Sequence, residues 1–159
     1  MRVMVRFIAL AFAVSAICAV GKDKPSASSE RASAKAVAES FMSDLVGNQI
    51  RKALDRMEPE FVAAAGGRTD AEKVVIKLFD YCGRPLDSEF KHDEIGFKLS
   101  ANGRKKPMRK FYYAASTNQH PKGVCFFAVE VVPGDKGGFQ VTTFGPLMVV
   151  SGQLPDFLR

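Results

Sequence analysis

The late part of the chain alternates apolar and polar side chains with a period of two, which is typical of β-strands. In the run VCFFAVEVV, one face is apolar at every second position, namely at Cys125, Phe127, Val129 and Val131. The alternation resumes after the turn PGDKGG, at Phe139, Val141 and Thr143. Two such runs joined by a glycine-rich turn predict a β-hairpin, and we expect its first arm at the centre of a sheet.

An earlier pair of runs predicts a second hairpin. Ile95, Phe97 and Leu99 alternate with smaller or polar residues, and residues 108–116, MRKFYYAAS, provide a return arm. Asn102-Gly103 lies between the two runs. Because both central residues of a type I′ turn need positive φ, this dipeptide is a strong hairpin signal.

The segment before these strands has helical spacing instead. Apolar positions recur three and four residues apart from Ser33 onward, at Ala34, Val37, Ala38, Phe41 and Leu45. A second stripe comprises Ile50, Ala53, Leu54 and Met57. The third and clearest stripe comprises Ala71, Val74, Val75, Leu78, Phe79 and Cys82. Thr69 and Glu72 have the spacing of a capping box at the start of this third helix.

The order of these elements predicts the fold class. Two or three helices come first and about four strands joined by hairpins follow. This order predicts an α+β fold, with N-terminal helices packed on a curved antiparallel sheet. We place this single domain at residues 33–151, followed by a tail at residues 152–159. A chain of 159 residues can bury a core of its own without a metal or cofactor.

The N-terminus has the composition of a secretory signal peptide. A short basic head precedes an apolar run at residues 7–20, which is too short for a transmembrane helix. We expect residues 1–21 to be removed and residues 22–32 to form a disordered polar linker. The mature protein is therefore expected to be exported, either periplasmic or secreted.

Cys18 leaves a lipoprotein alternative open, in which this cysteine becomes the acylated first residue. Ile17, however, stands where such signals carry a small residue, so we favour plain cleavage. Removal of residues 1–21 lowers the formal charge from +6 to about +4. That charge is too mild to indicate nucleic-acid binding.

One part of the second hairpin is strongly basic. Five basic residues precede the aromatic run at 111–113, namely Arg104, Lys105, Lys106, Arg109 and Lys110. This pattern fits weak contact with an anionic surface such as lipid headgroups. It also fits a solubility role, which we favour, since basic residues at a hairpin tip oppose edge-to-edge pairing of sheets.

Export permits disulfides, and the expected mature chain keeps two cysteines, Cys82 and Cys125. Each lies on the apolar face of its predicted element, so both are expected to point into the same core. A disulfide between them would close a loop of roughly 40 residues and add ~3–4 kcal/mol of stability. A pair of buried free thiols fits the same pattern.

Both histidines of the chain lie in polar segments. His92 is followed by Asp93 and Glu94, but adjacent residues of an extended segment point to opposite faces and chelate a metal poorly. His120 lies in the segment TNQHPKG. We therefore expect both histidines in solvated loops, with no metal site, no cofactor and no catalytic constellation, and no base beside either cysteine.

Aromatic residues on the predicted strands are candidates for a pocket between the sheet and the helices. We take Tyr112, Tyr113, Phe127 and Phe144 as the predicted ligand-binding residues. The alternative, which we favour, is ordinary core packing, because so many aromatic side chains in one small core have to pack against one another.

The chain resembles the cystatin-like α+β fold of the nuclear-transport-factor-2-like superfamily, in particular its small exported bacterial domains. The resemblance covers residues 34–150 and rests on the helix AVAESFMSDLVGN leading into IRKALDRMEPEF, on a further helix, and on strands ending FQVTTFGPLMVV. It implies a cone-shaped space between sheet and helices, which this superfamily uses for isomerases, dehydratases, transport adaptors and binding modules. It transfers no site residues to this chain.

From these observations we expect an exported, non-catalytic binding or interaction domain that takes a small apolar ligand or a protein partner. The alternative is a small enzyme of the isomerase or dehydratase type, with its acid and base inside the cone. An apolar sheet face often pairs in the superfamily that this chain resembles, so a homodimer is open as well.

Overall fold

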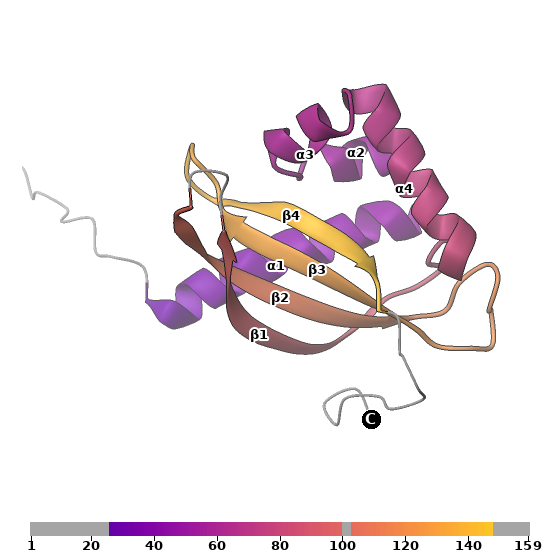
Figure 1. Cartoon of the computed structure of the whole chain (residues 1–159). Coiled ribbons are helices and arrows are strands. Elements are labelled where there is room, and N and C mark those ends of the chain that lie inside the picture. The colour runs from indigo at the N-terminus through magenta and orange to yellow at the C-terminus, as the bar shows by residue number, and fades with distance from the viewer. Residues whose placement is uncertain (1–25, 100–102, 148–159) are drawn as a thin grey trace, which may run out of the picture.

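The computed structural model describes residues 26–99 and 103–147. Within these residues the helices come first, namely α1 (Ala27–Val46), α2 (Ile50–Leu54), α3 (Pro59–Ala64) and α4 (Arg68–Cys82). The strands follow, namely β1 (Glu89–Leu99), β2 (Lys105–Ala115), β3 (Cys125–Pro133) and β4 (Phe139–Pro146). Figure 1 shows the helices packed with a curved, unclosed sheet, which confirms the predicted α+β fold class.

The strands form one antiparallel sheet in the order β1-β2-β3-β4. The register places Tyr113 opposite Phe127, and Val129 opposite Phe144. Irregularities in the pairing occur between Phe90 and His92 in β1 and at Glu130/Val131 in β3. Such bulges increase the local twist of a strand, in keeping with the curvature of this sheet.

The helices cover one face of the sheet and enclose the main core. α1 crosses behind the sheet in Figure 1, and it buries Ala34, Ala38, Phe41, Met42 and Leu45. The sheet contributes Phe111, Tyr113, Ala115, Phe127, Val129, Val131, Val141 and Phe144 to the same core. The predicted stripes of α2 and α4 are largely buried here too, although Val74 of α4 is exposed.

A smaller apolar cluster lies on the opposite face of the sheet. It consists of Tyr112, Ala114, Phe126 and Ala128, with Leu147 packed against it. Each of these strand residues is the neighbour in sequence of a residue in the main core, as the alternation of a strand requires.

Two boundaries differ from the predictions. α1 begins at Ala27, where the side chain of Ser26 accepts a hydrogen bond from the backbone N–H of Ser29, so residues 27–32 of the predicted linker are helical. The predicted capping box is wrong, because α4 begins at Arg68 with Gly67 as its N-cap and Thr69 lies inside the first turn. Gly66 and Gly67 both have positive φ, which lets the chain enter the helix earlier than expected.

Several predictions concern residues outside the part of the chain that the structure describes. These are the signal peptide at residues 1–21, residues 22–25 of the linker, Asn102 of the hairpin turn, residues 148–151 of the domain, and the tail at residues 152–159. Gly103, the described half of the turn, has φ of +74°, which fits the predicted turn type.

Candidate functional site

The four aromatic residues that we predicted to bind a ligand do not share one space. Tyr113, Phe127 and Phe144 are buried in the main core, on the side of the sheet that the helices cover. Tyr112 is buried in the cluster on the opposite face. Since the sheet separates Tyr112 from the other three, the predicted four-residue pocket is not formed.

Around the three core aromatics, the space between helices and sheet is occupied by other side chains. The ring of Phe144 meets that of Phe41 edge to face, with centroids 4.9 Å apart. The ring of Tyr113 lies 6.0 Å from that of Phe90, also edge to face. These are the distances of packed aromatic pairs, so the geometry is that of an ordinary core.

One polar atom in this core has no partner. Among the buried side chains of the described residues, the Tyr113 hydroxyl makes no hydrogen bond. Burial raises the pKa of Tyr113, and the negative charges of Glu39 and Asp93 raise it further, so the phenol stays protonated at neutral pH.

On the opposite face, Tyr112 is linked to β1. Its hydroxyl donates a hydrogen bond to Glu94, and its ring stacks on that of His92 with centroids 6.2 Å apart. Burial, the bond to Glu94 and the charges of Glu94 and Glu130 raise the pKa of Tyr112. The prediction that His92 lies in a solvated loop is wrong, since His92 is half-buried on a strand. β1 begins at Glu89, well before the alternating run at Ile95 from which the strand was predicted. His120 is exposed in a loop, as predicted.

β1 carries a stripe of exposed apolar side chains. Ile95, Phe97 and Leu99 are 68%, 67% and 68% exposed, respectively. They alternate along the strand and lie on the same face as Asp93. Asp93 pairs with Phe111 of β2, which belongs to the main core, so this is the face that the helices cover. These three residues, here termed the β1 stripe, thus lie on the helix-covered face, but at the hairpin end that the helices leave open.

β1 is also an edge of the sheet. Over its 11 residues it pairs with β2 alone among the described strands, so its other side presents unpaired backbone groups. The opposite edge of the sheet is partly covered. There Val141 of β4 donates a backbone hydrogen bond to Arg56 and accepts one from Glu58, both at 2.8 Å. The long open edge and the exposed apolar stripe therefore occur on the same strand.

The basic residues of the hairpin are mostly paired with acids from other elements. The pairs are Lys98 with Glu58, Lys106 with Asp135 at 3.4 Å, Arg109 with Asp93 at 3.2 Å, and Lys110 with Glu130 at 3.3 Å. Arg31 of α1 also binds Asp93. Sequence spacing could not reveal the pairs of Lys98 and Lys106, because Glu58 and Asp135 lie 40 and 29 residues away in the chain. Paired charges attract an anionic surface less strongly than free ones, which favours a structural role for the basic run.

Cys82 at the end of α4 and Cys125 at the start of β3 come together at the border of the main core. Both are free thiols in the structure and both are half-buried. The Sγ atom of Cys125 lies 3.7 Å from the carbonyl oxygen of Cys82. Burial raises the pKa of Cys82, and the neighbouring Cys125 raises it further.

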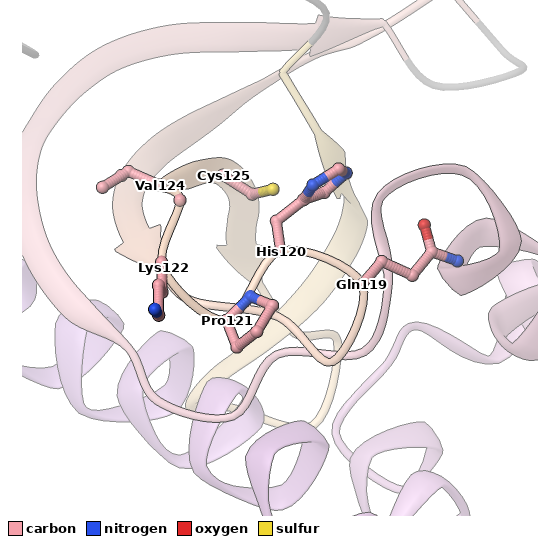
Figure 2. Close-up of a pocket in the computed structure, with 7 residues that line it drawn as sticks. Gln119, His120, Pro121, Lys122, Val124 and Cys125 are labelled. Atoms are coloured by element: carbon pink, nitrogen blue, oxygen red, sulfur yellow. The ribbon is translucent and has the colours of Figure 1, made fainter.

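Cys125 also lines a surface cavity of about 630 Å³, together with the loop residues Gln119 to Val124. Figure 2 shows the sulfur of Cys125 and the ring of His120 on the walls of this cavity. Sequence reasoning expected no base beside either cysteine, and here the fold brings a histidine to the same cavity. The structure shows no hydrogen bond between the two side chains.

Comparisons with known protein families, with curated proteins and with solved structures found no match to this chain. None of the described helices is both long and apolar enough to cross a membrane. Within the described ranges, no group of three or more His, Cys, Asp or Glu side chains could hold a metal ion. The function therefore has to be inferred from the surfaces and the core of the chain.

Proposed function

We propose that this chain is an exported, non-catalytic interaction domain that binds an extended segment of a protein partner along β1. One observation carries the proposal: an open hydrogen-bonding edge and three apolar side chains, each about two-thirds exposed, occur on the same strand. A partner strand added to such an edge would satisfy its backbone groups and cover its apolar side chains together.

The shape of the β1 stripe favours a polypeptide strand over a small apolar ligand. Alternate residues of a strand are ~6.8 Å apart, so the stripe extends in a line over ~13 Å. A second strand presents side chains with the same spacing, whereas a small ligand is usually enclosed in a concave site. The aromatic core that we predicted as such a site is occupied by packed side chains.

The other face of β1 restricts the chemistry of the partner. Glu94 lies on the face opposite to the stripe, is exposed, and accepts a hydrogen bond from Tyr112. A carboxylate has further acceptor positions, so it can also bind a basic side chain across the strand pair. We therefore expect a partner segment that alternates apolar and polar residues and carries a lysine or arginine opposite Glu94.

A second copy of this chain has a strand of the required kind. If two copies of β1 pair antiparallel about Gly96, Ile95 of one copy lies opposite Phe97 of the other, so the two stripes adjoin on one face of the joined sheet. Homodimer formation is thus the case to measure first, by sedimentation equilibrium of the full chain and of its Phe97→Lys variant. The superfamily resemblance and the isomerase or dehydratase alternative stay predictions.

A labelled synthetic peptide tests the proposed function directly. It alternates valine with polar residues, carries one arginine to face Glu94, and is titrated with the full chain while fluorescence anisotropy is followed. We expect saturable binding that Phe97→Lys weakens by about tenfold or more, since it places a charge where apolar contact is needed. The matched control is Ile76→Lys, which adds the same charge at an exposed apolar residue of α4.

A second peptide separates strand addition from simple apolar adhesion. It has the same side chains but N-methylated amides on the side that would face β1, so it cannot donate hydrogen bonds to the edge. We expect it not to bind. Equal binding of both peptides, equal binding by the Phe97→Lys variant, or no binding of either peptide would each contradict the proposal.

A further inference from the structure

The two segments beside the cysteines are hydrogen bonded to each other. The backbone N–H of Arg84 donates to the side-chain oxygen of Asn118 at 2.7 Å, and the N–H of Asn118 donates to the carbonyl of Arg84 at 3.0 Å. The N–H of Leu86 donates to the carbonyl of Ser116 at 2.9 Å. These bonds between residues 83–86 and 116–119, here termed the loop clasp, join the end of α4 to the β2–β3 loop.

The loop clasp is closely packed as well as hydrogen bonded. Thr117 is fully buried within it, and the side-chain amide of Gln119 donates to the carbonyl of Phe79 at 3.2 Å. Gly83 has φ of +82°, and a Cβ atom there would lie 2.7 Å from Asn118 and 2.8 Å from Thr117. The backbone on both sides is therefore held in place without any contribution from the thiols.

The two cysteines flank the loop clasp directly. Cys82 immediately precedes Gly83, and Cys125 begins β3 just after the loop. The 3.7 Å contact from the Sγ of Cys125 reaches the carbonyl oxygen of Cys82. Because this carbonyl and the side chain of Cys82 branch from the same Cα atom, the two thiols are neighbours in the folded chain.

We propose that Cys82 and Cys125 are oxidised to a disulfide in the exported protein, which ties the end of α4 to the start of β3. Two S–H bonds break and one S–S bond forms, and two protons and two electrons leave the protein. In the compartment that receives the chain, a thiol oxidoreductase in its disulfide form accepts them. In vitro, oxidised glutathione accepts them and yields two molecules of reduced glutathione.

Thiol–disulfide exchange on the folded chain tests this inference. The full-length chain with Cys18→Ser is produced with reduced thiols, checked for folding by circular dichroism, and incubated with oxidised glutathione. We expect the intact mass to fall by two hydrogen atoms, and peptide mapping to identify a Cys82–Cys125 link. The reaction should be intramolecular, so the glutathione mixed disulfide should not accumulate, whereas it should accumulate in the single variants Cys82→Ser and Cys125→Ser.

Stability and compartment provide two further readouts. The midpoint of thermal unfolding of the oxidised protein should fall by several degrees when a reductant is added, and that of the double variant Cys82→Ala/Cys125→Ala should not respond. Wild-type chain recovered from an oxidising compartment should carry the link before any treatment.

Accumulation of mixed disulfide on the folded two-thiol chain would overturn the inference of neighbouring thiols. If the link forms in vitro but the exported chain carries free thiols, the proposal that the cysteines are oxidised in the cell is wrong. That result would leave the proposed interaction surface unaffected.

Discussion

A buried ion pair between Glu58 and Lys98 joins the hairpin that carries the β1 stripe to the segment after α2. The side chain of Glu58, in the segment after α2, is only 4% exposed, whereas that of Lys98 on β1 is 33% exposed. Lys98 also donates a hydrogen bond to Thr142 on β4. We predict that Lys98→Met destabilises the protein by ~2–3 kcal/mol at pH 7, because it leaves a buried carboxylate without its nearest cation.

The size of this effect follows from the surroundings of Glu58. Burial alone would raise its pKa, but hydrogen bonds from Lys98 and Thr142, together with the charges of Lys98 and Lys106, outweigh burial and hold the pKa below the usual value of 4.5. Without Lys98, the carboxylate either stays charged near Lys106 at 4.0 Å or takes up a proton. Protonation of a glutamate with the usual pKa costs about 3.4 kcal/mol at pH 7, which sets the upper limit.

The same reasoning gives a pH dependence with a definite sign. In the wild-type protein the lowered pKa of Glu58 contributes stability that is present above pH 4.5 and is lost as the pH falls through the folded-state pKa. In the Lys98→Met variant, burial raises the pKa of Glu58, so the variant gains stability between pH 7 and pH 5. The difference between the two proteins should therefore shrink over this range.

Urea unfolding at pH 7 and at pH 5 measures the free energy of unfolding of the wild-type protein and of the variant. Far-ultraviolet circular dichroism is a suitable probe because the chain contains no tryptophan. The control is Lys91→Met on the same strand, whose partner Glu89 is 72% exposed, and its effect should stay below about 0.5 kcal/mol. A Lys98→Met effect as small as that of the control, or one of equal size at pH 7 and pH 5, would refute the reasoning.

Two further predictions concern the loop clasp and the main core, and both are measured by chemical denaturation. Gly83→Ala should destabilise by ~2 kcal/mol or more, because its positive φ strains a side chain and its Cβ would lie 2.7 Å from Asn118. Gly137→Ala, with similar φ but open space around it, should have about half that effect, and equal effects would show that packing against the loop is unimportant. Phe127→Ala in the core should destabilise by ~3–5 kcal/mol, whereas Phe97→Ala on the surface should be nearly neutral. Comparable losses for the two phenylalanines would contradict the burial of Phe127 in the main core and the exposure of Phe97 at the open hairpin end of the same face.

Hydrophobic periodicity was sufficient to predict the order of the elements and much of the core. The alternating residues Phe127, Val129 and Val131 all face the helices, and the stripe of the first helix, from Ala34 to Leu45, is largely buried against them. Periodicity works here because each element buries one face and exposes its polar residues on the other. The same reasoning placed Cys82 and Cys125 on the apolar faces of their elements, and both are packed against the main core.

The parts that sequence reasoning missed depend on tertiary contacts. Strand alternation should have separated Tyr112 from Tyr113, but it could not show that both faces of β2 are buried at this point. Nor could alternation show that Phe97, in an equally regular run, lies beyond the reach of the helices. The partner of Lys98 could not be predicted either, because Glu58 is 40 residues away in the chain.

The contact between Phe41 and Phe144 joins the first helix to the last strand, with ring centroids 4.9 Å apart. Much of the apolar surface of α1 therefore has no cover until nearly all of the chain has been synthesised. Domains with such long-range contacts fold late, once their final segment is free. If the chain is exported as we propose, this delay would keep the polypeptide unfolded while it crosses the membrane, and pairing of β4 with β3 would complete the domain afterwards.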